Sequence, residues 1–234
     1  MEKVSTDNDK VNWESVLNAE IVTFGLLGKI LYTFPDKSWI LSLVDQELFQ
    51  SIPLETDHPD VIAGLELLQA WIVETEYGEF EDNFQELKLD YTRLFIGVDR
   101  VLAPPWESVH LNNEHLLFQE QTLQVRSWYS QFGWEVIQRK KEPDDHIAVE
   151  LNFLSRLAQL GLQALEVKDR AAFEKTLEAQ RRFMSEHLLK WVFLWRQQVI
   201  QHSQTKFFKG VALLTTGVIQ EFAQILRPVV GETK

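Results

Sequence analysis

The sequence contains no cysteine, which excludes disulfide bonds and metal sites built on thiolates. The phosphate-binding pattern G-x-x-x-x-G-K-[ST] is also absent, because the nearest run, at residues 25–29, is too short and falls inside a predicted helix. Neither His-Glu-x-x-His nor Gly-x-Ser-x-Gly occurs. The chain therefore lacks the signatures of P-loop nucleotide enzymes, zinc proteases and serine hydrolases.

Basic charge is scarce: 23 Lys and Arg residues stand against 35 Asp and Glu residues, and the formal net charge is −12. Nucleic acid is not expected as a partner, because phosphate binding needs a basic face. An acidic balance favours a cationic partner or serves solubility alone, and solubility is the commoner explanation.

Long apolar runs are missing as well. The first ten residues are polar and acidic, without the apolar region of a secretory signal. A membrane span needs about 20 apolar residues, and the best stretch, at residues 210–217, is far shorter. We therefore expect a cytoplasmic protein without a transmembrane segment.

Apolar residues recur at helical spacing through most of the chain, and no segment alternates like a strand. The spacing predicts helices over 12–34, 37–50, 59–76, 80–96, 114–132, 143–167, 169–199 with a break near 185–189, and from 205 up to Pro228. Residues 97–112 are expected to be irregular. The prediction is an all-α, single-domain bundle of about eight helices over residues 12–228, with a disordered N-terminal tail at 1–11 and a C-terminal tail at 229–234. The basic connector at 134–142 could serve as a hinge for domain swapping.

The segment EPDDHIAVELNFL, at residues 142–154, begins one of these helices. Pro143 suits the first helical turn, and Asp144 and Asp145 suit the positive end of the helix dipole. Taken alone, the segment is explained as a well-made helix start. A helix start needs only one capping acid, however, whereas this segment adds a titratable His146 and a further acid, Glu150.

A second motif lies upstream, with YTRLFIG at residues 91–97 and APPWESV at 103–109. Together the two motifs resemble the signatures of the TorD/DmsD family of cytoplasmic chaperones for bacterial molybdoenzymes, and they are closest to its DmsD-like branch. The resemblance covers residues 15–226 in the order of its elements. It implies a TorD-like helical fold, no enzymatic activity and no cofactor. Glu107 stands where DmsD-type sequences often have Gly after Pro-Pro-Trp.

The resemblance implies a system-specific chaperone that binds the twin-arginine signal peptide and the apo-form of a molybdopterin oxidoreductase, assists cofactor insertion and delays export. Such a leader has a cationic start and an apolar middle, so its site needs acids and an apolar groove. The positions that match the family's leader-binding residues are Leu94, Phe95, Pro104, Pro105, Trp106, Pro143, Asp145 and His146. Tyr91, Glu107, Ser108, Asp144 and Glu150 would support them.

Within this site we expect Asp145 to pair with a leader arginine and Trp106 to contact the apolar segment. An equally good interpretation of Trp106 is a purely structural one. His146 would shape the site and make binding sensitive to pH. The partners implied are the leader and the catalytic subunit of the oxidoreductase, and the chaperone would be a monomer or a domain-swapped dimer.

The alternative is a helical enzyme, or a guanine-nucleotide-dependent maturation factor, that uses Asp144, Asp145, His146 and Glu150 as acid–base groups. His146 and Glu150 lie one helical turn apart, which favours a local hydrogen bond or ion pair over a metal site.

The sequence also contains Glu55-x-x-His58 and Glu107-x-x-His110, which have the spacing of ligands in di-iron helix bundles. Both pairs lie beside prolines in predicted loops, whereas that metal site needs inward-facing helical positions. Chance spacing is therefore the simpler explanation, and no metal is predicted.

Overall fold

The computed structural model describes residues 11–45, 49–97, 100–112, 114–135 and 142–227, and every regular element in these ranges is helical. The α-helices are α1 (Trp13–Tyr32), α2 (Lys37–Asp45), α3 (Pro59–Tyr77), α4 (Phe80–Tyr91), α5 (Glu107–Leu111), α6 (Glu120–Gln131), α7 (Ile147–Glu166), α8 (Arg170–Phe183), α9 (Leu189–His202) and α10 (Lys206–Ile225). Single π-helical turns follow α4 (η2, Thr92–Ile96) and join α8 to α9 (η3, Met184–Leu188). The predicted all-α fold is confirmed.

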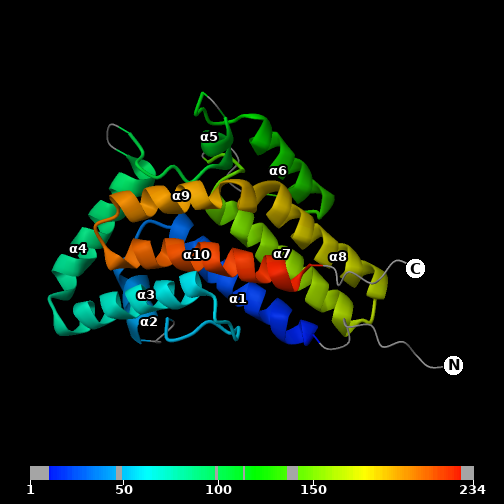
Figure 1. Cartoon of the computed structure of the whole chain (residues 1–234), viewed down its shortest axis with the longest axis horizontal. Coiled ribbons are helices and arrows are strands. Elements are labelled where there is room, and N and C mark those ends of the chain that lie inside the picture. The colour runs from blue at the N-terminus through cyan, green and yellow to red at the C-terminus, as the bar shows by residue number, and fades with distance from the viewer. Residues whose placement is uncertain (1–10, 46–48, 98–99, 113, 136–141, 228–234) are drawn as a thin grey trace.

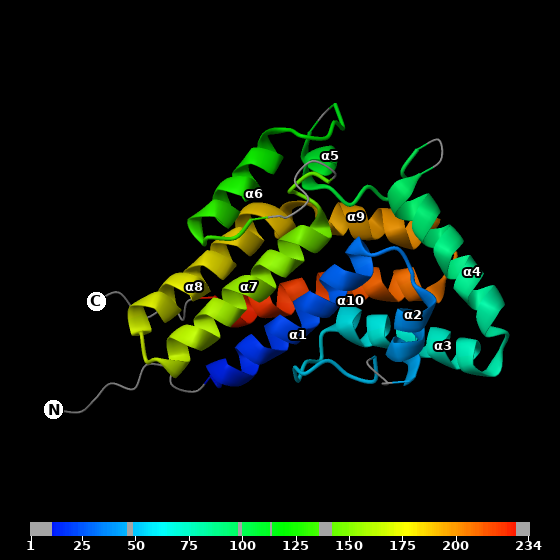
Figure 2. The same cartoon turned by 180° about the vertical axis from the view of Figure 1, so that it is seen from behind.

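Helices that are distant in the sequence lie side by side. α1 packs along α7, and α3 packs along α10. In Figure 1, α10 runs between α9 and α3 on the near face, and Figure 2 shows α1 and α7 on the other face. α4 closes one end of the bundle, while α5 packs on α9 and α6. The APPWESV half of the second motif therefore leads into the edge where α5, α6 and α9 meet, whereas its YTRLFIG half forms the end of α4 and η2.

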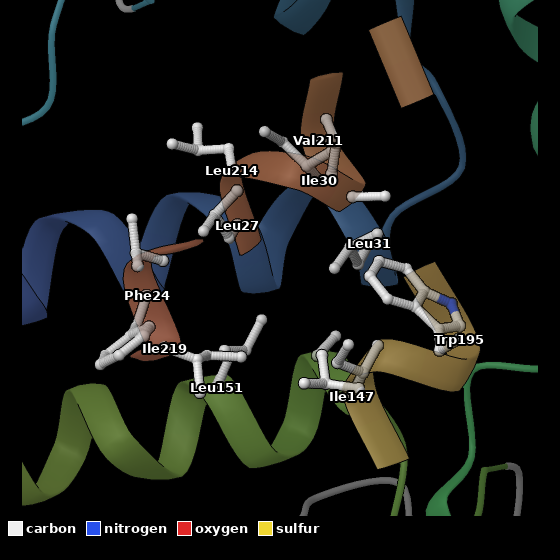
Figure 3. Close-up of a cluster of buried hydrophobic side chains, with 14 of the residues drawn as sticks. Phe24, Leu27, Ile30, Leu31, Ile147, Leu151, Trp195, Val211, Leu214 and Ile219 are labelled. Carbon is white, nitrogen blue, oxygen red and sulfur yellow. The ribbon is translucent and has the colours of Figure 1, made fainter. Parts of the chain in front are cut away.

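One apolar core joins the two faces. Figure 3 shows the side chains that meet there: Phe24, Leu27, Ile30 and Leu31 of α1, Ile147 and Leu151 of α7, Trp195 of α9, and Val211, Leu214 and Ile219 of α10. All of them are buried. Because Ile147 and Leu151 directly follow the EPDDH motif, packing of α7 in this core fixes the position of the motif.

The backbones of α3 and α10 approach each other so closely that there is no room for a side chain between them. A Cβ atom on Gly64 would lie 2.7 Å from the backbone N of Leu214 and 2.9 Å from the carbonyl O of Gly210. A Cβ on Gly210 would in turn lie 2.8 Å from the carbonyl O of Gly64. Glycine is required at these positions because one helix backbone touches the other.

Several predicted helix ends are confirmed. Asn12, Asp169 and Thr205 each cap the helix that follows, and each side chain accepts a hydrogen bond from the backbone N–H three residues on. The break expected near 185–189 is found as the π-helical turn η3. Gly97, which follows η2, has a positive φ of 74° that favours glycine. Its ψ of 151°, however, is not that of a left-handed helix.

The start of α7 differs from the prediction. The helix begins at Ile147, so Pro143 is not in its first turn, and Asp144 and Asp145 precede it. His146 is the N-cap, and its Nδ1 accepts a hydrogen bond of 3.1 Å from the backbone N–H of Ala148. Asp144 and Asp145 instead accept hydrogen bonds from residues that are distant in the sequence, as described below.

The segment predicted as irregular also differs, because it contains the short helix α5. The Asp145 carboxylate accepts a hydrogen bond from the backbone N–H of Ser108 in the first turn of α5. α6 begins at Glu120 and not at residue 114, since His115 and Phe118 have positive φ angles of 52° and 59° that interrupt a helix.

Some predictions fall outside the described residues. These are the tails at 1–10 and 228–234, and residues 136–141 of the connector proposed as a hinge. α2, predicted to reach residue 50, ends at Asp45, and residues 46–48 are likewise outside the described part.

The apolar length of α1 was underestimated from the sequence. By length and composition this 20-residue helix could cross a membrane. Its apolar residues, among them Leu17, Phe24 and Leu27, are buried against the rest of the bundle. A core helix of this length meets the same criterion.

Candidate functional site

The two motifs meet in space. Trp106 and His146 form an isolated antiparallel bridge. Beside it the Glu107 N–H donates to the Asp145 carbonyl O over 3.0 Å, and the Ile147 N–H donates to the Pro105 carbonyl O over 2.8 Å. The Pro-Pro-Trp segment is thereby attached to the start of α7.

Asp145 is fully buried and holds two further elements to α7. Its Oδ2 accepts the Ser108 N–H at 2.8 Å, and its Oδ1 accepts the Thr122 hydroxyl at 2.6 Å. Both oxygens are therefore occupied by buried donors from α5 and α6. A leader arginine could reach this carboxylate only if the segment that carries Ser108 moved away.

Asp144 is similarly occupied. Its Oδ2 accepts a hydrogen bond of 2.5 Å from the guanidinium of Arg126, and its carbonyl O accepts the Tyr129 hydroxyl at 2.9 Å. Both donors lie on α6, so the pair of acids fixes α6 against the start of α7. Burial, together with four surrounding acids, raises the pKa of Tyr129 well above its usual value.

His146 is held between aromatic rings. Its ring lies edge-on to Tyr32 and to Trp106, with centroid distances of 5.6 Å and 5.9 Å. Burial lowers the pKa of His146 to about 3, so the ring is neutral near pH 7. The proposed pH sensitivity cannot come from this group, because its charge changes far below physiological pH.

Glu107 forms a buried pair with a residue that lay outside both motifs. The His187 Nδ1 lies 2.9 Å from one Glu107 carboxylate oxygen, and both side chains are buried. Glu107 thus binds η3 to α5. This contact explains physically why a carboxylate, and not Gly, follows Pro-Pro-Trp in this chain.

Glu150 does not form the expected hydrogen bond or ion pair with His146. It is completely buried, and neither carboxyl oxygen has a hydrogen-bond partner in the described part of the chain. Burial, and then the charges of Glu107 and Asp145, raise the pKa of Glu150 well above its usual value. The nearby Trp191 indole lowers it slightly without forming a well-aligned hydrogen bond. This shift favours the neutral carboxyl, which costs less to bury than a carboxylate.

The apolar motif residues also lie inside the bundle. Tyr91, Leu94 and Phe95 are buried, and the Tyr91 hydroxyl donates to the Leu31 carbonyl O at 3.3 Å. Burial, with the charge of Glu142, raises the pKa of Tyr91 to about 12. Pro105 and Pro143 are buried as well.

Two predicted residues, Pro104 and Trp106, remain partly exposed. Beside Trp106 lies Glu142, a half-buried acid that makes no ion pair among the described residues. Burial raises the pKa of Glu142, and the neighbouring Trp106 indole offsets part of that shift. Glu142 opens the EPDDH motif but was not selected from the sequence, since only the structure separates it from the acids that have internal partners.

A group of exposed apolar side chains was also missed. Leu116, Leu117 and Phe118 follow α5, and Leu123 lies on the first turn of α6, with exposed fractions between 37% and 62%. The sequence predicts a helix over 114–132, in which apolar residues at helical spacing would face the core. In the structure α6 begins only at Glu120, and these four side chains are exposed. We call these four residues the α5–α6 apolar patch.

The arrangement does not resemble an acid–base catalytic site. Both Asp145 oxygens and one Asp144 oxygen accept internal donors, and His146 is neutral and acts as a helix cap. The His58 Nδ1 caps α3, and no group of three or more potential metal ligands occurs in the residues that the structure describes.

Comparison with known proteins supports a class of protein other than an enzyme. Residues 58–196 match the family described as nitrate reductase delta subunit. The chain is 29% identical over 197 residues to Chaperone protein TorD of Vibrio cholerae serotype O1 strain O395, covering 84% of this chain and 81% of the relative. It is 31% identical over 153 residues to TorD of strain N16961, covering 65% and 68%.

A relative named Probable Tat proofreading chaperone DmsD, from Haemophilus influenzae, is 28% identical over 138 residues, covering 59% of this chain and 61% of the relative. A solved structure described as a candidate redox enzyme maturation protein from Archaeoglobus fulgidus covers 97% of this chain and 99% of its own, at 18% identity and a TM-score of 0.44. That structural likeness is too low to support an argument.

The relatives named as chaperones, together with the helical fold, define a chaperone and not an enzyme. The chain belongs to the nitrate reductase delta subunit family, which includes proteins of the TorD and DmsD type. The family prediction is therefore confirmed. Relatives of both names match, so the narrower placement in the DmsD-like branch stays a prediction.

Proposed function

We propose that this chaperone binds the twin-arginine signal peptide of a molybdopterin oxidoreductase and holds the apo-enzyme in the cytoplasm until its cofactor is inserted. The proposal is supported by the relatives named TorD and Tat proofreading chaperone DmsD. One observation supports a particular binding site for the leader. The half-buried Glu142 carboxyl lies beside the half-buried Trp106, where the two family motifs meet.

Glu142 is the proposed acceptor for a leader arginine. Its desolvated carboxyl has no cationic partner in the described part of the chain. The guanidinium of a leader arginine would supply a positive charge and form a charge-assisted hydrogen bond with it. Asp145, which the sequence favoured for this role, acts in our proposal as a positioning residue that holds the Pro-Pro-Trp segment on α7.

The apolar middle of the leader would contact Trp106, Pro104 and the α5–α6 apolar patch. Exposed apolar side chains gathered on one segment are typical of a binding surface. α5 follows Trp106 directly in the chain, so this patch continues from the motif. The buried Leu94, Phe95, Pro105, Pro143 and His146 would shape the site from beneath.

Glu142→Gln should weaken binding of a synthetic twin-arginine leader about tenfold, because it removes one charge-assisted hydrogen bond. Trp106→Ala should weaken binding by a similar factor through lost apolar contact, and it should leave the salt dependence unchanged. Fluorescence anisotropy titrations at two salt concentrations measure both effects.

The matched control is Glu66→Gln, which makes the same change in net charge on the exposed surface of α3. It should alter leader affinity less than about twofold. If Glu66→Gln and Glu142→Gln weaken binding equally, the effect comes from overall charge and Glu142 is not the acceptor.

Leader binding should strengthen as pH rises. Burial raises the pKa of free Glu142 above its usual 4.5, whereas a bound guanidinium favours the charged carboxylate and lowers that pKa. Affinity is therefore lost as pH falls through the free-state pKa and reaches a plateau above it. Titrations between about pH 5 and pH 8 measure this, and Glu142→Gln should flatten the profile. If leader affinity still depends on pH in the Glu142→Gln variant, the group that titrates is not Glu142.

The identity of the client and the choice between a monomer and a domain-swapped dimer stay predictions. The proposed hinge at 134–142 includes residues outside the described part of the chain. Sedimentation velocity of the pure protein would distinguish the two states.

A further inference from the structure

A groove separate from the proposed leader site lies between α3, α9 and α10. It is on the face opposite α1 and α7, where α10 runs between α9 and α3 (Figure 1). It encloses about 750 Å³ and is lined by the apolar residues Leu67, Phe193, Leu194, Ile200 and Leu213. We call it the α9 groove. Leu194 and Ile200 remain 46% and 37% exposed, so the groove presents large apolar side chains to solvent.

The lining residues of α9 lie at helical spacing. Phe193, Gln197 and Ile200 follow one another at intervals of four and three residues, and Leu194 and Gln201 flank them. This stripe extends over about two helical turns, or about 10 Å. An amphipathic helix that places an apolar stripe in such a groove is a recurring mode of recognition.

The charge of the groove differs from that of the whole protein. Asp60 is the acid in its lining and forms an ion pair with Arg196, whereas Lys209 makes no ion pair in the part of the chain that the structure describes. No Asp or Glu occurs between His187 and Gln220, although the chain has 35 acids. The cations Lys190, Arg196, Lys206 and Lys209 lie in that interval, and Lys206 pairs with Glu74 of α3.

We propose that the α9 groove binds an amphipathic helix with acidic flanks, presented by the body of the client enzyme. Its apolar stripe would cover Leu194 and Ile200, and its acids would meet Lys209 and the outer face of Arg196. The proposal rests on the proposed function for the identity of the partner, but not for the chemistry of the groove. A twin-arginine leader has the opposite charge, so this surface and the leader site select different segments.

The probe is a labelled synthetic peptide of about 18 residues, with Leu at positions i, i+3, i+4 and i+7 and Glu on the flanks. A second peptide replaces each Glu with Lys. Anisotropy titration of the full chain should give a Kd in the micromolar range for the acidic peptide and at least about tenfold weaker binding for the basic one.

Leu194→Ser combined with Ile200→Ser should weaken binding of the acidic peptide tenfold or more. The control is Leu89→Ser, an exposed leucine on α4 outside both proposed surfaces, which should leave this affinity unchanged. Lys209→Glu should also weaken binding and should flatten its salt dependence. Thermal melts check that each variant is folded, which is expected because the substituted leucine and isoleucine are partly exposed.

Equal binding of the acidic and basic peptides, or wild-type affinity in the Leu194→Ser/Ile200→Ser variant, would overturn the proposal. A wild-type dimer that this variant converts to monomer would also overturn it, since the groove would then bind a second copy of the chain.

The leader peptide should bind the Leu194→Ser/Ile200→Ser variant as it binds wild type, and a loss of leader binding would show that the groove is the leader site. If the acidic peptide fails while the leader binds, only this inference fails. If the leader fails while the acidic peptide binds, only the proposed function does.

Discussion

Gly64→Ala should destabilise the protein by about 1–3 kcal/mol, although alanine is the better helix former. The added Cβ would lie 2.7 Å from the Leu214 N and 2.9 Å from the Gly210 O. These are backbone atoms, so no side chain can rotate to make room, and α3 must move away from α10. In a chain of this length, each kcal/mol corresponds to a fall of about 2–4 °C in melting temperature.

Gly25→Ala is the matched control, because it makes the same substitution inside α1. There the nearest atom to a new Cβ is the Ser155 Oγ at 3.8 Å, which is an ordinary contact. The substitution should therefore stabilise the protein by about 0.5–1 kcal/mol through helix propensity alone. Thermal and urea unfolding of both variants measure the difference in sign. Stabilisation by both substitutions would mean that α3 and α10 are not in backbone contact.

The fold could be predicted well because its information is local. Apolar residues at helical spacing, with caps such as Asn12 and Thr205, determine where each long helix lies. The close approach of Gly64 and Gly210 could not be predicted, because it depends on which helices pack together. A glycine inside a helical pattern gives no sign of its partner.

The site was predicted only in part, because its hydrogen bonds connect residues that are far apart in the sequence. Local rules place Asp144 and Asp145 in the first turn of a helix, whereas Arg126, Ser108 and Thr122 are their actual partners. The two motifs do meet in the structure, at the bridge between Trp106 and His146. They did not distinguish residues that hold it together from residues that face a ligand, because that distinction depends on burial.

Asp145 offers the sharpest test of that distinction. Asp145→Ala should destabilise the protein by about 3 kcal/mol, since it leaves the Ser108 N–H and the Thr122 hydroxyl buried without an acceptor. Asp145→Asn should cost about 1 kcal/mol or less. Its amide oxygen can accept the Ser108 N–H, and its amide N–H can donate to the Thr122 Oγ. The loss of charge also removes one of the causes that raise the pKa of Glu150.

Leader titration of the folded Asp145→Asn variant then separates the two roles of this residue. As a positioning residue, Asp145 should tolerate the change, with leader affinity within about twofold of wild type. As a direct partner of a leader arginine, it should lose a charge-assisted bond and about tenfold to a hundredfold in affinity. We expect the first result because both carboxylate oxygens already accept buried donors. We also expect Glu142→Gln to show the opposite combination, with a normal melting temperature and weakened binding. A folded Asp145→Asn variant that binds a hundredfold more weakly would mean that the Ser108 segment leaves Asp145 when the leader binds.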